Sequence, residues 1–154
     1  MSLIWPERIT FRRQGLTCLT RLLSAARPRE GCALLLGRGG GPTWEVERIW
    51  PCCNVWEPAA ERRRRFAIDP REQLLAQKWG RSRQLQVLGS AHSHPATAPQ
   101  PSPTDCLLAF PPALLVIAGV PAGASGLPGG WELRCWWLGE ENTTPQPLAW
   151  TMVD

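Results

Sequence analysis

Prolines and glycines interrupt this chain so often that its helices and strands must be short. The 154 residues include 16 prolines and 14 glycines, which predicts many turns. Between these turns lie apolar runs of the length and composition that predict buried strands. The runs are GCALLLG (31–37), LQVLGSAHSH (85–94), ALLVIAGV (113–120) and WELRCWWL (131–138). We expect further strands over 44–49 and 64–68, and an edge strand over 148–153.

Helical patterns alternate with these predicted strands. Over residues 11–26, leucines 16, 19 and 23 fall on one face. Asp69-Pro70 and Ser102-Pro103 pair a capping side chain with a proline suited to the first helical position, so each predicts a helix start. With 44% apolar residues the chain can bury a sizeable core. This mixture predicts a single α/β or α+β domain over residues 1–154.

Charge and cysteine content exclude several classes of protein. The net charge of +4 is short of the dense basic stripe that nucleic-acid binding needs, so we expect no nucleic-acid partner. The most apolar stretch, 110–124, is too short and too rich in proline to span a bilayer. We therefore expect a soluble, cytoplasmic protein with no membrane partner. In that setting the six cysteines are buried free thiols, the alternative being a disulfide framework in a secreted protein.

The histidines carry the clearest chemical signal. The chain has only two, His92 and His94, and residues i and i+2 of a strand point to the same face. Two adjacent imidazoles can hold one metal ion, and a catalytic zinc commonly has a third protein ligand. Asp105, at the start of the next predicted helix, is the nearest candidate. The alternative is that both histidines are ordinary strand residues and that Asp105 only complements the helix dipole.

The whole string around these histidines is more specific. His92-Ser93-His94-Pro95, followed by Ser102 and Asp105, matches the H-[ST]-H-P-x6-S-x-x-D pattern of JAMM/MPN-domain metalloproteases. The segments PREGCALLLG (28–37), PCCN (51–54) and RFAIDP (65–70) resemble further landmarks of small prokaryotic members. The resemblance covers residues from about 8 to 120. It implies a cytidine-deaminase-like three-layer fold in which helices flank a central mixed sheet.

The same resemblance implies roles for individual residues. His92, His94 and Asp105 match the ligands of one Zn²⁺ per chain. Glu30 matches the glutamate that takes a proton from the attacking water and gives it to the leaving amine. Ser102 matches the serine that donates a hydrogen bond to the developing oxyanion. Taken alone, Glu30 would be a solvated acid near a helix end, and Ser102 a simple helix cap.

The activity implied is that of a zinc metalloprotease acting on a peptide or isopeptide bond. Small prokaryotic relatives resemble enzymes that act at the Gly-Gly tails of ubiquitin-like or sulfur-carrier proteins, so we expect such a substrate. The alternatives are a non-catalytic MPN scaffold and a RadC-like protein associated with DNA. We expect loop 52–63 or loop 121–130 to form a wall of the substrate groove. A homodimer contact through Trp136-Trp137 is a further alternative. The arginine run 62–65 is expected to be a solvated strand edge, with substrate docking as the alternative.

Overall fold

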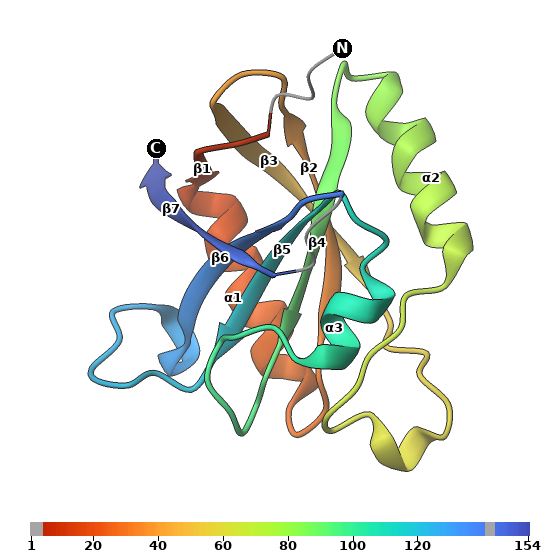
Figure 1. The fold of residues 1–154 in the computed structure, drawn as a ribbon, viewed down its shortest axis with the longest axis vertical. Helices are drawn as coiled ribbons and strands as arrows, with labels where there is room; N and C mark the ends of the chain where they lie inside the picture. Colours follow the sequence, from red (N-terminus) through yellow and green to blue (C-terminus); the bar gives the residue numbers. More distant parts are fainter. Residues whose placement is uncertain (1–4, 141–143) are drawn as a thin grey trace.

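A computed structural model describes residues 5–140 and 144–154, which form a mixed sheet with helices on both faces (Figure 1). The strands are β1 (Arg8–Arg12), β2 (Cys32–Arg38), β3 (Thr43–Cys52), β4 (Gln86–Ser93), β5 (Ala113–Gly119), β6 (Glu132–Leu138) and β7 (Gln146–Val153). The helices are α1 (Arg13–Ala26), α2 (Pro70–Arg81) and α3 (Pro103–Leu108), with 3₁₀ turns η1 (Ala59–Glu61) and η2 (Pro128–Gly130). The predicted α/β class is confirmed.

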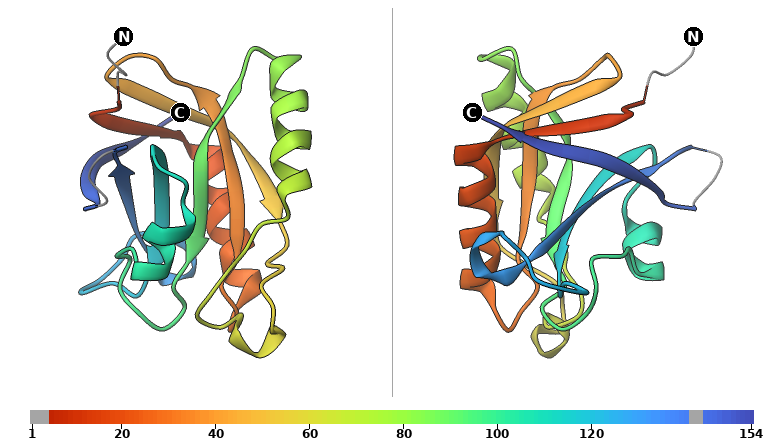
Figure 2. Two further views of the ribbon diagram at one scale, coloured as in Figure 1. Left: turned by 45° about the vertical axis from the view of Figure 1, so that its right-hand side comes forward. Right: turned by 90° about the vertical axis from the view of Figure 1, so that its left-hand side faces the viewer.

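The sheet runs in the order β1-β3-β2-β4-β5-β6-β7 and closes on itself, because β1 pairs with both β3 and β7. The β4–β5 pair and both pairs of β1 are parallel, while the others are antiparallel. Figure 2 shows β7 crossing beside β1, far from it in sequence. The expectation of an edge strand over 148–153 is therefore wrong, since β7 has a neighbour on each side.

Two other sequence expectations fail locally. The helix expected over 11–26 begins at Arg13, and Phe11 belongs to β1. In β1, Phe11 is buried between the half-buried Thr10 and the exposed Arg12. The strand expected over 64–68 is absent from the described ladders. There, Ala67 N–H donates to the side-chain oxygen of Asn54 and its carbonyl accepts from Val55, so loop contacts replace strand pairing.

A helix packs on each face of the sheet. On one face, leucines of α1 join the main apolar core with strand residues such as Leu35 and Val116. On the other face, Ala76 of α2 packs against Leu34 and Leu36 of β2. The right-hand view of Figure 2 shows α1 and α3 at opposite sides of the sheet. The result is the three-layer arrangement that the resemblance implies. No helix in the described ranges is long and apolar enough to cross a membrane.

The packing of α1 predicts a difference between two leucines that both lie in helices. Leu19 is fully buried, whereas Leu74 of α2 is 65% exposed. Leu19→Ala should lower the free energy of unfolding by about 2–5 kcal/mol, because it leaves a cavity in the main core. Leu74→Ala should change it by less than about 0.5 kcal/mol. Urea unfolding of both variants measures this, and equal losses would contradict the assigned faces.

Candidate metal centre

The two histidines lie at the carboxyl end of β4 and turn the same ring nitrogen to one point. His92 is fully buried and His94 nearly so, and their Nε2 atoms are 3.1 Å apart. The N–H of His94 donates to the carbonyl of Ala118, which holds the chain beside β5 just after β4 ends. The ring of Phe66 stacks on His92 with centroids 4.3 Å apart, which fixes the orientation of that ring.

Asp105 meets both rings through a single oxygen. Its Oδ2 lies 3.1 Å from Nε2 of His92 and 3.1 Å from Nε2 of His94. A capping box at the start of α3 holds the carboxylate there: Ser102 N–H donates to Asp105 Oδ2, and Asp105 N–H donates to Ser102 Oγ. Ser102 is thus an N-cap, and its hydroxyl hydrogen is not used by that bond, because a hydroxyl can accept and donate at once.

Glu30 lies between α1 and β2 and is 4% exposed, so it is not the solvated acid of the alternative interpretation. One of its oxygens and a ring nitrogen of each histidine lie within 4.8 Å of one another. Its Oε1 is buried and has no hydrogen-bond partner in the described part of the chain. Burial raises the pKa of Glu30 to about 8, against the lowering effect of His94 and with a further increase from Asp105.

The donor atoms fit one divalent metal ion. Ligands of a tetrahedral zinc with bonds of 2.0–2.1 Å lie roughly 3.3 Å apart, close to the 3.1 Å spacings among His92, His94 and Asp105. His94 Nδ1 is 2.9 Å from the carbonyl of Ala98, so Nδ1 carries the hydrogen and Nε2 keeps its lone pair for a metal. A buried group of this kind could hold a metal ion.

The electrostatics favour the metal-binding protonation states of His92 and Asp105 but not that of His94. Burial alone would lower the pKa of His94, but its hydrogen bonds with Asp105 and Ala98 outweigh burial and raise that pKa. Complete burial lowers the pKa of His92, although the Asp105 carboxylate opposes this, and the neutral ring is the form that binds metals. Burial alone would raise the pKa of Asp105, but the contacts with His92 and His94 outweigh it and hold that pKa well below its usual range. Asp105 is therefore an ionised carboxylate.

Asn54 ties the long loop after β3 to Glu30. Its Nδ2 donates to the carbonyls of Glu30 and Arg65, both at 2.9 Å, and its Oδ1 accepts from the N–H groups of Trp56 and Ala67. The sequence marks Asn54 only as a family landmark, and sequence reasoning missed this structural role. The signal available was an amide, able to donate and accept, within a loop that lacks regular structure.

The two loops expected to wall a groove differ in position. Glu30 N–H donates to the carbonyl of Arg62, so loop 52–63 lies against the metal centre. In loop 121–130, by contrast, the carbonyl of Gly129 accepts from Arg27, just after α1. The arginine run is not a strand edge: Arg62 donates to the carbonyl of Trp56, and Arg65 donates to Thr104.

The cysteines add no ligand to the centre. All six are free, and Cys32 and Cys135 are buried while Cys18 and Cys53 are exposed, so the prediction of buried thiols holds only in part. Cys32 is in register with His92 on the neighbouring strand, but its sulfur lies 3.9 Å from the carbonyl of Cys52. It is a core residue beside the site.

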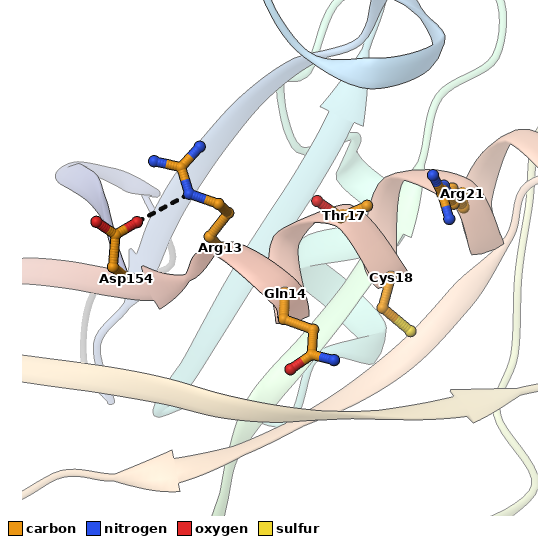
Figure 3. Close-up of a pocket in the computed structure, with 6 residues that line it drawn as sticks. All are labelled: Arg13, Gln14, Thr17, Cys18, Arg21 and Asp154. Atoms are coloured by element: carbon orange, nitrogen blue, oxygen red, sulfur yellow. Dashed lines mark hydrogen bonds and ion pairs between the residues drawn. The ribbon is translucent and has the colours of Figure 1, made fainter.

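Two hollows in the described part of the chain differ in the residues that line them. One, of about 640 Å³, follows the outer side of α1, where Arg13 pairs with Asp154 (Figure 3). The other, of about 570 Å³, lies on the side of α2 and α3 and reaches Asp105. Only the second adjoins the metal centre.

Fold and site together define a three-layer α/β domain with a buried histidine, aspartate and glutamate cluster at the end of a central strand. The chain belongs to the family of prokaryotic homologues of the JAB domain, whose family model matches residues 14–139. This confirms the JAMM/MPN resemblance. A search of the curated proteins finds no match.

Solved structures share this fold along nearly the whole chain. The solution structure of a Desulfitobacterium hafniense protein is 29% identical, with a TM-score of 0.79 and coverage of 95% of this chain and 93% of that one. A Salinibacter ruber protein is 25% identical, with a TM-score of 0.64 and coverage of 94% and 92%. A JAB1/MPN domain protein from Archaeoglobus fulgidus has 19% identity, a TM-score of 0.55 and coverage of 96% and 99%, which shows a common fold.

The contacts of Asn54 predict a strong effect from a change of one atom. Asn54→Asp replaces an amide donor that serves two carbonyls by an oxygen that repels them, so the free energy of unfolding should fall by about 1–3 kcal/mol. Gln77→Glu, the same chemical change at an exposed position of α2, is the control and should be nearly neutral. Urea unfolding compares them, and a neutral Asn54→Asp would show that Asn54 does not organise the loop.

Proposed function

We propose that the protein is a zinc-dependent hydrolase of peptide or isopeptide bonds. The observation that carries this proposal is the buried Glu30 oxygen that lacks a partner in the described chain, close to the ring nitrogens of His92 and His94. Buried polar groups are normally satisfied, because leaving one unpaired is unfavourable by about 1–3 kcal/mol. An unpaired carboxylate beside converging metal-ligand atoms is typical of a functional site rather than of a structural one.

We propose Asp105, rather than Glu30, as the third ligand beside the two histidines. Asp105 Oδ2 makes equal 3.1 Å contacts with both Nε2 atoms and is fixed by the capping box of α3. An oxygen of Glu30 lies within 4.8 Å of the ring nitrogens of both histidines. In this assignment, Glu30 would contact a water molecule bound to the metal rather than the metal itself.

In the proposed reaction, the metal and the protein side chains have different roles. When bound, zinc acts as a Lewis acid that makes hydroxide available near neutral pH. Glu30, whose ionised form a bound cation would favour, accepts the proton that the attacking water loses and passes it to the nitrogen of the leaving amine as the C–N bond breaks. The Ser102 hydroxyl donates to the carbonyl oxygen as negative charge develops there, a contribution of about a few kcal/mol. The net reaction adds one water across the C–N bond.

The substrate we propose is the C-terminal Gly-Gly tail of a ubiquitin-like or sulfur-carrier protein. Membership of the JAB family supports this choice, and the loop over 52–63 lies against Glu30 through the bond between Glu30 N–H and the carbonyl of Arg62. A non-catalytic binding role for the same fold is separated from this proposal by the metal content and by the effect of Glu30, as tested below.

The ligand assignment predicts the metal content of two variants. The purified protein should bind one zinc ion per chain, and His94→Ala or Asp105→Ala should lose most of it while staying folded. Gln100→Ala, an exposed change in the same loop, should keep full occupancy. Elemental analysis with circular dichroism measures both properties. Full zinc occupancy in both ligand variants would rule out this ligand set.

The proposed role of Glu30 predicts that a variant loses turnover while it keeps its zinc. Glu30→Gln keeps the size of the side chain but removes the proton acceptor, so turnover should fall at least about 10²-fold while zinc content and unfolding free energy are maintained. Steady-state cleavage of a Gly-Gly-tailed carrier protein with a C-terminal extension, followed by mass spectrometry, gives the rate. Cleavage at the rate of the unaltered protein would overturn the mechanism, and loss of zinc would make Glu30 a ligand.

A further inference from the structure

The groove that reaches Asp105 is built largely from apolar side chains. It has a volume of about 570 Å³, and residues of α2, α3 and β4 line it. Figure 1 labels these three elements. Phe66 and Ile68 from the loop before α2, and Leu108 and Phe110 from the end of α3 onward, contribute to its lining. A hollow of this size and composition is typical of a site that receives an apolar group.

A small residue, Ser90, contributes to the floor of the groove. Ser90 of β4 is in register with Leu34 of β2 and with Leu115 of β5, so a serine separates two leucines across the sheet. His92 follows two positions later on the same face, about 7 Å along the strand. Ser90 is therefore about one strand repeat from the metal centre.

A large apolar side chain, that of Phe110, is exposed at the rim of the groove, and the backbone of Phe110 is strained. Phe110 is 85% exposed and has a φ of 52°, a left-handed conformation that is unfavourable for any residue with a side chain. Leu108 beside it is 43% exposed. An exposed apolar patch next to a groove marks a surface that contacts a partner.

One arginine at the rim, Arg64, has no ion-pair partner in the described part of the chain. Asp69 pairs with Arg71, and Arg65 pairs with Glu61, so these charges are compensated. Arg64 also lines the groove, is exposed, and its guanidinium makes no hydrogen bond or ion pair within residues 5–140 and 144–154. The groove thus offers an apolar floor and a cationic rim.

From these features we propose that the groove over Ser90 is a specificity pocket for a peptide substrate. It takes a bulky apolar side chain, such as that of Leu, Ile, Met or Phe, from a residue within about two positions after the scissile bond, since glycines precede that bond in the proposed substrate and an extended chain advances about 3.3 Å per residue. Arg64 pairs with an acidic residue next to it in the peptide. This inference rests on the proposed hydrolase function and adds a substrate sequence to it.

Continuity with the metal centre favours a peptide over other occupants. The groove includes Asp105, so whatever lies in it is presented to the cluster of Glu30 and the two histidines. A second copy of the chain docked there would cover the same cluster and block access to it. The apolar floor and the Arg64 charge together match an apolar residue with an acidic neighbour.

Binding can be tested without any turnover. Two fluorescein-labelled octapeptides with a Gly-Ser background differ only at the centre, which is Leu-Glu in one and Ser-Gln in the other. Fluorescence anisotropy with the zinc-loaded protein should show at least tenfold tighter binding of the Leu-Glu peptide. Ser90→Leu, which fills the floor, should abolish this preference, whereas Ser82→Leu at the exposed end of α2 should keep it. Arg64→Gln should remove only the part of the affinity that the Glu of the Leu-Glu peptide contributes.

Phe110→Gly separates binding from folding. Glycine adopts a φ of 52° without strain, so the variant should be no less stable than the unaltered protein while losing peptide affinity severalfold. Unaltered affinity in both Phe110→Gly and Ser90→Leu, with both variants folded, would overturn the pocket.

Cleavage-site profiling distinguishes the pocket from the function on which it rests. A peptide library digested by the protein and read by mass spectrometry should show Leu, Ile, Met or Phe enriched within two residues after the cleaved bonds, with Asp or Glu adjacent. Cleavage without that enrichment overturns the pocket and leaves the hydrolase function standing. Selective binding without cleavage supports the groove as a peptide site and overturns the function. A dimer that Phe110→Gly dissociates would assign the groove to a second copy and overturn the proposal.

Discussion

The oxygen Oδ2 of Asp105 is the point on which the candidate site depends. It lies 3.1 Å from a nitrogen of each histidine at the end of β4, and it accepts from the N–H of Ser102 at the start of α3. α3 has only six residues, so the capping box supplies much of what holds it in place. The carboxylate of Asp105 thus takes part in the cap of α3 and also contacts the two candidate metal-binding histidines.

Glu30 is held by a different segment of the chain, the loop after β3. Its backbone is bonded to loop 52–63 through Arg62 and through the amide of Asn54, while its buried Oε1 has no hydrogen-bond partner among residues 5–140 and 144–154. The backbone bonds supply the stability that an unpaired carboxylate lacks. This division lets a group that is unfavourable in isolation remain in place beside the histidines, as a proton acceptor requires.

The groove shows how the same framework can select a substrate. A serine at position 90 contributes to the floor, and an exposed phenylalanine in a strained backbone conformation forms part of the rim. Neither feature improves the stability of the fold, since a larger residue at position 90 would bury more apolar surface and a glycine at position 110 would remove the strain. Their position beside Asp105 connects them to the chemistry of the site.

The sequence by itself determined the features that depend on near neighbours in the chain. The caps at Asp69 and Ser102, the strand that carries His92 and His94, and the nearness of Asp105 all follow from spacing within about a dozen residues. Only the tertiary structure decided that β7 closes the sheet against β1, that Phe11 joins a strand, and that the amide of Asn54 holds Glu30. Each of these depends on partners far away in sequence, and local preference carries no information about which distant segment completes a hydrogen bond or buries a side chain.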